Sequence, residues 1–83
     1  MIILKYEVPI EDNFTIEIPD PFKILSFQVQ NDRPYIWVQC EDINSKKDKV
    51  KFSIVGTGHE IYFHGFYIGT VQLPPFVWHL FMR

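Results

Sequence analysis

The fold is decided by the stretch Lys23-Ile-Leu-Ser-Phe-Gln-Val-Gln-Asn-Asp-Arg-Pro-Tyr-Ile-Trp-Val-Gln-Cys-Glu41. Apolar and polar side chains alternate along Lys23–Gln30 and again along Tyr35–Glu41, which is the period of a half-buried strand. The first of these strands is expected to carry Leu25, Phe27 and Val29 on one face. Asn31–Pro34 lies between them and consists of residues that favour turns. The stretch therefore predicts an antiparallel hairpin.

The same alternation extends the prediction to the whole chain. Five more strands are expected at Ile2–Val8, Phe14–Ile18, Val50–Val55, Phe66–Leu73 and Phe76–Met82. The chain has no alanine, the best helix former, whereas Ile and Val recur throughout. The lysine-rich segment Asp42–Lys49 is expected to be a loop. The 83 residues thus predict one domain, residues 1–83, with an all-β fold: a small antiparallel sandwich or barrel of about seven strands.

Composition argues against several functional classes. Eight Lys and Arg against ten Asp and Glu give a net charge of −2, so binding of nucleic acid through a generally basic surface is not expected. The single cysteine, Cys40, cannot form an internal disulfide. The apolar start Met1-Ile-Ile-Leu4 is too short for a signal peptide, and no apolar run approaches the roughly 18 residues of a membrane span. These features predict a soluble intracellular protein without a membrane partner.

The segment Gly56-Thr-Gly-His59 is the candidate binding site. Glycines let a backbone approach a ligand, and exposed amides at a bend can bind an anion. The predicted ligand-binding residues are Gly56, Thr57, Gly58 and His59, together with an aromatic such as Trp37 or Tyr67, within one chain or across a subunit boundary. The alternative interpretation is structural: a β-bulge or tight bend whose glycines adopt unusual dihedral angles, with His59 on a loop.

Neither a metal site nor a catalytic site is indicated by spacing. The histidines His59, His64 and His79, even with Cys40, match no familiar zinc pattern. No serine or cysteine has an adjacent base that spacing reveals. The sequence therefore predicts a protein that has no cofactor and no metal and is not an enzyme.

Aromatic residues make up 17% of the chain, more than one face of a small sandwich needs. Tyr35 and Trp37, and the segment from Tyr62 to Tyr67, are expected to leave apolar surface uncovered. Aromatic side chains are enriched at interface cores, and edge strands offer unpaired backbone groups. We therefore expect a homo-oligomer.

Several segments resemble one small family. The resemblance is carried by Lys23–Gln30, Tyr35–Val38, Phe52–His59, Tyr67–Leu73 and Phe76–Phe81, and it covers nearly the whole chain. It points to a family of unknown function among short proteins of tailed phages and prophages. The resemblance implies no activity and no functional residues; it implies an accessory protein in the cytoplasm of a bacterial host.

Together, the residues and the resemblance predict an accessory binding protein that antagonises a host defence process. Two partners are open: a small nucleotide-type signal that the protein sequesters, or a host protein that it blocks. An alternative from another class is a small structural component of the virion.

Overall fold

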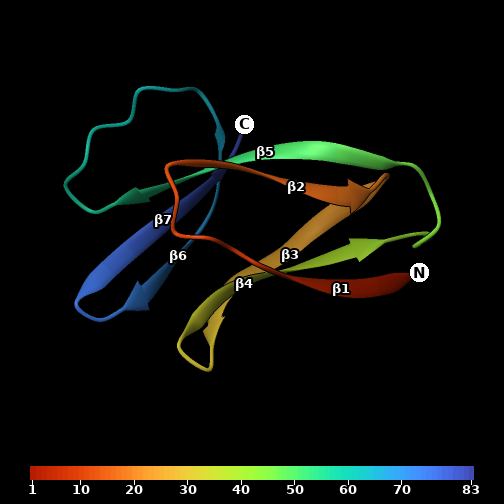
Figure 1. The fold of residues 1–83 in the computed structure, drawn as a ribbon, viewed down its shortest axis with the longest axis horizontal. Helices are drawn as coiled ribbons and strands as arrows, with labels where there is room; N and C mark the ends of the chain where they lie inside the picture. Colours follow the sequence, from red (N-terminus) through yellow and green to blue (C-terminus); the bar gives the residue numbers. More distant parts are fainter.

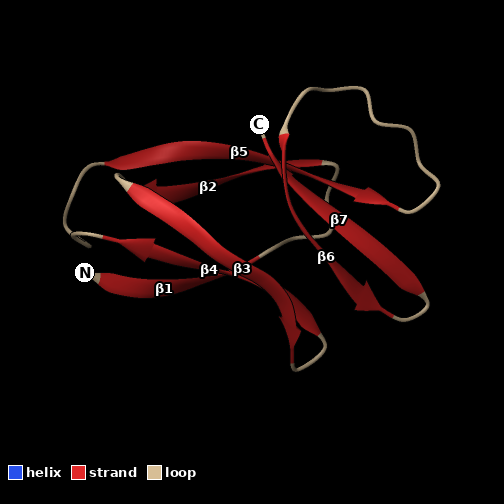
Figure 2. Cartoon of the chain, turned by 180° about the vertical axis from the view of Figure 1, so that it is seen from behind, coloured by secondary structure: helices blue, strands red, loops and turns tan.

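The computed structural model describes residues 1–83 and contains only β-strands and loops (Figures 1 and 2). The strands are β1 (Ile2–Glu7), β2 (Asn13–Pro19), β3 (Phe22–Gln30), β4 (Arg33–Cys40), β5 (Lys47–Gly56), β6 (Phe66–Leu73) and β7 (Phe76–Met82). They form a three-stranded sheet of order β1-β4-β3 and a four-stranded sheet of order β2-β5-β7-β6, with every pair antiparallel. The all-β prediction is confirmed as a small sandwich. No helix is present that could cross a membrane.

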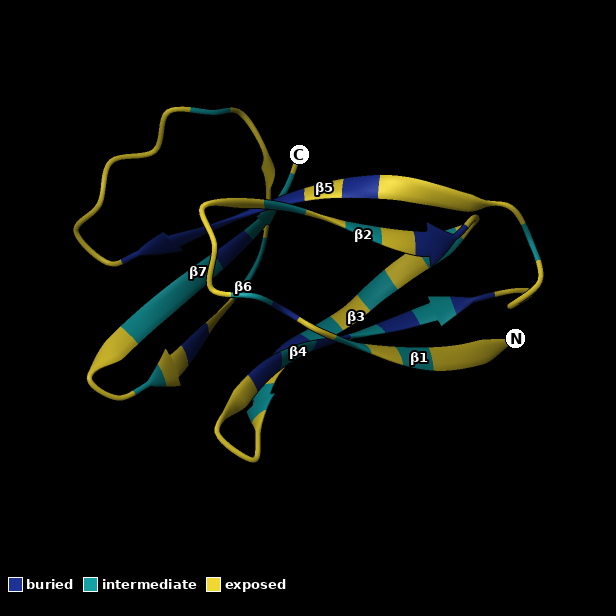
Figure 3. Cartoon of the chain, in the orientation of Figure 1, coloured by how far each residue is buried: buried dark blue, intermediate teal, exposed yellow.

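The core lies between the two sheets, and both contribute to it (Figure 3). It contains Val8, Ile18, Phe27, Ile36, Val38, Val50, Phe52, Ile54, Val71 and Leu80. In β4 the buried residues alternate with half-buried ones, as the period of two requires. The side chains of Ile36 and Val38 point into the core, and those of Tyr35 and Trp37 point to the opposite face.

The β3–β4 hairpin confirms the predicted turn but shortens it. Asn31 and Asp32 have φ angles of 52° and 63°, the left-handed conformation that both central residues of a type I′ turn adopt. Pro34 is expected in the turn but lies in β4 opposite Val29. Because a type I′ turn needs only two residues between the strands, pairing resumes at Arg33.

Two bulges change the expected faces. The pairing of β3 with β4 shifts between Ile24 and Ser26, so Leu25 is the extra residue and is 42% exposed. The prediction that Leu25 shares a face with Phe27 is therefore wrong, because an inserted residue resets the alternation. A second shift in β6 precedes Gly69, whose Cβ, if present, would lie 3.4 Å from the Phe27 Cβ. Gly69 lets β6 pack closely against β3.

The fifth strand begins earlier than predicted. Lys47–Lys49 is expected to belong to a loop, but these residues pair with Glu17–Pro19 of β2, and Lys49 stands opposite Glu17. The alternation rule misses this end of β5 because its side chains are all exposed. Opposite charges on facing positions stabilise such a pair by roughly 0.2–1 kcal/mol.

Alkaline pH is expected to destabilise the fold through Tyr6. Burial against the core, and then the charge of the Cys40 thiolate, raise the pKa of Tyr6 above its ordinary value of 10.0. A folded-state pKa above the unfolded one means that stability is complete below about pH 10 and is lost as the pH rises through the folded-state pKa. Urea midpoints measured from about pH 9 to pH 11 should fall less steeply for Tyr6→Phe than for the wild type. Equal slopes would contradict this assignment.

Candidate functional site

The predicted site is a tight turn at the end of β5. The His59 N–H donates to the Gly56 carbonyl at 3.1 Å, which closes a four-residue turn, and the Thr57 N–H donates to the Val77 carbonyl at 3.2 Å. Gly58 has a φ of 91°, which side chains rarely adopt. A Cβ on Gly56 would lie 3.0 Å from the His59 imidazole. Each glycine thus has a structural reason, and the segment is a turn rather than a bulge.

A chain of hydrogen bonds runs from this turn across the outer face of the four-stranded sheet. The Thr57 Oγ1 lies 2.7 Å from the Nε2 of His79 on β7. The Nδ1 of the same imidazole lies 2.9 Å from the Oγ1 of Thr70 on β6. The Thr70 hydroxyl in turn lies 2.5 Å from the Tyr67 hydroxyl. Because Leu80 is fully buried, the adjacent His79 faces outward. Both imidazole nitrogens are therefore held by threonine hydroxyls.

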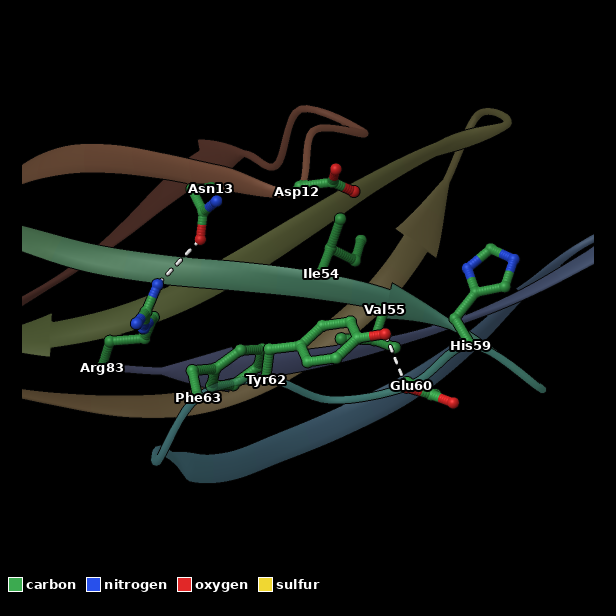
Figure 4. A pocket seen from close by; sticks show the side chains of 9 residues that line it. All are labelled: Asp12, Asn13, Ile54, Val55, His59, Glu60, Tyr62, Phe63 and Arg83. Atoms are coloured by element: carbon green, nitrogen blue, oxygen red, sulfur yellow. Dashed lines mark hydrogen bonds between the residues drawn. The ribbon is translucent and has the colours of Figure 1, made fainter.

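An open groove of about 490 Å³ lies beside the turn (Figure 4). It is lined by Asp12, Asn13, Ile54, Val55, His59, Glu60, Tyr62, Phe63 and Arg83. These residues come from the start of β2, the end of β5, the segment after the turn and the last residue of the chain. Figure 4 shows Arg83 and His59 at opposite ends of the groove, with Tyr62 and Phe63 between them.

The groove exists because β2 is shorter than β5. Pairing between these strands stops at Asn13 and Ser53, whereas β5 continues to Gly56. Ile54–Gly56 therefore pair with β7 on one side and with no strand on the other. An unpaired strand end is a template for another extended segment.

Arg83 is held in a defined position at one end of the groove. Its guanidinium donates to the Asn13 Oδ1 at 2.8 Å and lies 4.8 Å from the centroid of the Phe63 ring. Phe63 packs edge-on against Phe81 of β7, at 5.5 Å between centroids. The Asn13 Oδ1 also accepts a hydrogen bond from the buried Ser53 hydroxyl at 2.8 Å.

The remaining polar groups of the groove are mainly acidic. Asp12 and Glu60 supply two carboxylates against the one guanidinium of Arg83. Glu60 accepts a hydrogen bond from the Tyr62 hydroxyl at 2.5 Å, and this bond raises the pKa of the Tyr62 phenol. Tyr62 is 86% exposed, so its ring is free to contact a ligand.

The structure brings most of the predicted residues together and separates one. Thr57 and Tyr67 are the two ends of the hydroxyl–imidazole chain, and His59 lines the groove. Trp37 lies in the other sheet, on the face of β4 opposite the core, where it packs near Tyr35. A pocket that joins Trp37 to the turn is not formed within one chain and stays a prediction only across a subunit boundary.

Sequence reasoning missed the partners of Thr57 and Tyr67. A signal for one of them exists: a hairpin centred on Pro74–Pro75 pairs Leu73 with Phe76, and counting outward places Thr70 opposite His79. The contact of Thr57 with His79 has no such signal, because it depends on how β5 pairs with β7.

Metal ligation has no cluster to support it, since no three His, Cys, Asp or Glu side chains come together in the structure. The chain matches one protein family over residues 1–83, the family described as Domain of unknown function (DUF7352), and it belongs to that family. No curated protein matches the chain. No solved structure matches it either.

Proposed function

Because membership of this family supplies no activity, we propose from the groove that the protein is a binding protein that holds an extended segment of a partner protein. The observation that carries this proposal is the unpaired end of β5, Ile54–Gly56, which forms part of the groove floor. A segment in the groove can add to this edge through backbone hydrogen bonds, while its side chains contact the groove walls.

The side chains around the groove favour a protein partner. Exposed apolar residues cluster after the turn: Ile61, Tyr62, Phe66 and Tyr67 are 51%, 86%, 70% and 60% exposed. Aromatic residues of this kind form the anchors of protein interfaces. The two carboxylates and one guanidinium of the groove match a polypeptide of mixed charge better than a polyphosphate.

A nucleotide-type signal is the second candidate, and one contact favours it. The Arg83 guanidinium beside the Phe63 ring places a phosphate-binding cation next to an aromatic wall, and the exposed Tyr62 ring lies near enough to line the same groove. The carboxylates of Asp12 and Glu60 restrict this candidate to ligands with little negative charge, such as a nucleotide with one phosphate.

The cellular setting is part of the proposal. The resemblance to short phage and prophage proteins supports an accessory role in the cytoplasm of a bacterial host, where the protein antagonises a defence process by blocking a host protein. A structural role in the virion is the alternative, and abundance in purified particles would favour it.

Self-association belongs to the same proposal. β1 is an edge strand, and Met1, Ile2 and Ile3 at its start are all exposed. Exposed apolar residues on an edge strand favour pairing with another chain. Native mass spectrometry of protein purified from bacteria is expected to show more than one subunit and no retained small molecule. A retained nucleotide would favour the second candidate instead.

Site-specific photo-crosslinking in bacterial cells tests the groove directly. A photoreactive phenylalanine at position 62 is expected to give a discrete cross-linked protein, and the charge reversal Asp12→Lys in the same chain should weaken it. Position 76 is the matched control, because Phe76 is an exposed aromatic (58%) that does not line the groove. Equal cross-linking from both positions would contradict the groove as the binding surface.

A further inference from the structure

The turn carries a second chemical feature, which does not depend on what fills the groove. Thr57 is exposed, is flanked by two glycines, and has its Oγ1 only 2.7 Å from the Nε2 of His79. A hydroxyl group is a weak nucleophile until a base within hydrogen-bond reach takes its proton. We infer that Thr57 is an activated nucleophile and that the turn is an acyl-acceptor site for activated carboxylic esters.

The hydrogen-bond chain suits His79 to the role of base. With the Thr57 hydroxyl donating to Nε2, the proton of the neutral ring is on Nδ1 and is donated to the Thr70 Oγ1. The Thr70 hydroxyl then donates to the Tyr67 oxygen. Every group donates in one direction, so the arrangement leaves the Nε2 lone pair facing the nucleophile. Thr70 is a positioning residue that fixes the ring from its far side.

The backbone supplies a donor for the negative charge that develops during acyl transfer. Gly58 follows Thr57 directly, and its N–H donates no hydrogen bond to the backbone. In hydrolases with a nucleophile on a sharp turn after a strand, the N–H of the next residue stabilises the oxyanion. The order in this chain is the same: β5, then the turn with Thr57, then a free amide.

The acyl-transfer step is balanced without any further reagent. The Thr57 Oγ1 attacks the acyl carbon while its proton moves to the His79 Nε2. The bond from the acyl carbon to the leaving oxygen breaks, and the alcohol leaves as an anion or takes the proton from the imidazole. The product is an ester of Thr57. Because Thr70 is uncharged and offers the imidazolium no counter-charge, we expect slow acylation of about one equivalent rather than rapid turnover.

The test uses the intact 83-residue protein and 4-nitrophenyl acetate. Acetylation is followed by intact-protein mass spectrometry and located by peptide fragmentation. Thr57 is expected to be acetylated, and Thr57→Ser to retain the reaction, whereas Thr57→Ala should lose it. His79→Gln should slow it by about 100-fold. Thr70→Val should slow it as well, and Thr70→Ser should restore the rate.

An internal control guards against general hydroxyl acetylation and against misfolded variants. Thr15 is an exposed threonine of the same sheet, and the structure gives it no histidine partner. Faster acetylation of Thr57 than of Thr15 in the wild-type protein supports the proposal even where a variant fails to fold, as judged by circular dichroism. Equal rates at Thr57 and Thr15, or an unchanged rate at Thr57 in folded His79→Gln, would overturn it.

Discussion

Phe52→Ala is expected to destabilise the protein by about 3–5 kcal/mol, the cost of removing a large aromatic side chain from a core. Phe52 is 1% exposed and lies on the inner face of β5, where its ring stacks on Phe14 at 5.5 Å between centroids. Small domains unfold with a free energy of only about 5–15 kcal/mol. The body is 15 Å across its shortest axis, so little surrounding structure is available to collapse into the cavity. A large fraction of the variant should therefore be unfolded at 37 °C.

Chemical denaturation monitored by circular dichroism measures this change. Phe76→Ala is the matched control, since Phe76 is 58% exposed although its ring lies 5.6 Å from that of Trp78. Its cost should stay near or below about 1 kcal/mol. Similar costs for both substitutions would show that Phe52 is not central to the core.

The alternation that identifies Phe52 as a core residue also predicts most of the fold. Period-two patterns locate all seven strands, and the prolines mark where β2 and β6 end, at Pro19 and Leu73. The pattern fails where a backbone irregularity intervenes. The bulge at Leu25 resets the faces of β3, and nothing in its side chain distinguishes it from the apolar residues on either side of it.

The candidate site is less predictable because it depends on contacts between distant segments. The glycines of the turn are visible in the sequence, and the two conformational reasons for them emerge only in the structure. The Arg83–Asn13 hydrogen bond joins residues 70 positions apart, and it requires β2 and β7 to flank the same strand, β5. Alternation within one strand carries no information about which strands become neighbours.

Asn13 illustrates how one such contact determines both stability and the shape of the groove. Its Oδ1 accepts hydrogen bonds from the Ser53 hydroxyl and from the Arg83 guanidinium, each at 2.8 Å. Ser53 is 0% exposed, so its hydroxyl has no access to water. Asn13→Ala removes the acceptor and leaves this hydroxyl without a partner, which is expected to cost about 1–3 kcal/mol.

A double-mutant cycle separates the buried hydroxyl from the other effects of Asn13. In the background of Asn13→Ala, Ser53→Ala removes the orphaned hydroxyl, so the double variant should be at least as stable as Asn13→Ala alone. Urea midpoints of the four proteins measure the coupling. Strictly additive losses would show that the Ser53 hydroxyl finds another acceptor. Arg83 loses its anchor in both Asn13 variants, so cross-linking from position 62 should weaken equally in the two, whatever their difference in stability.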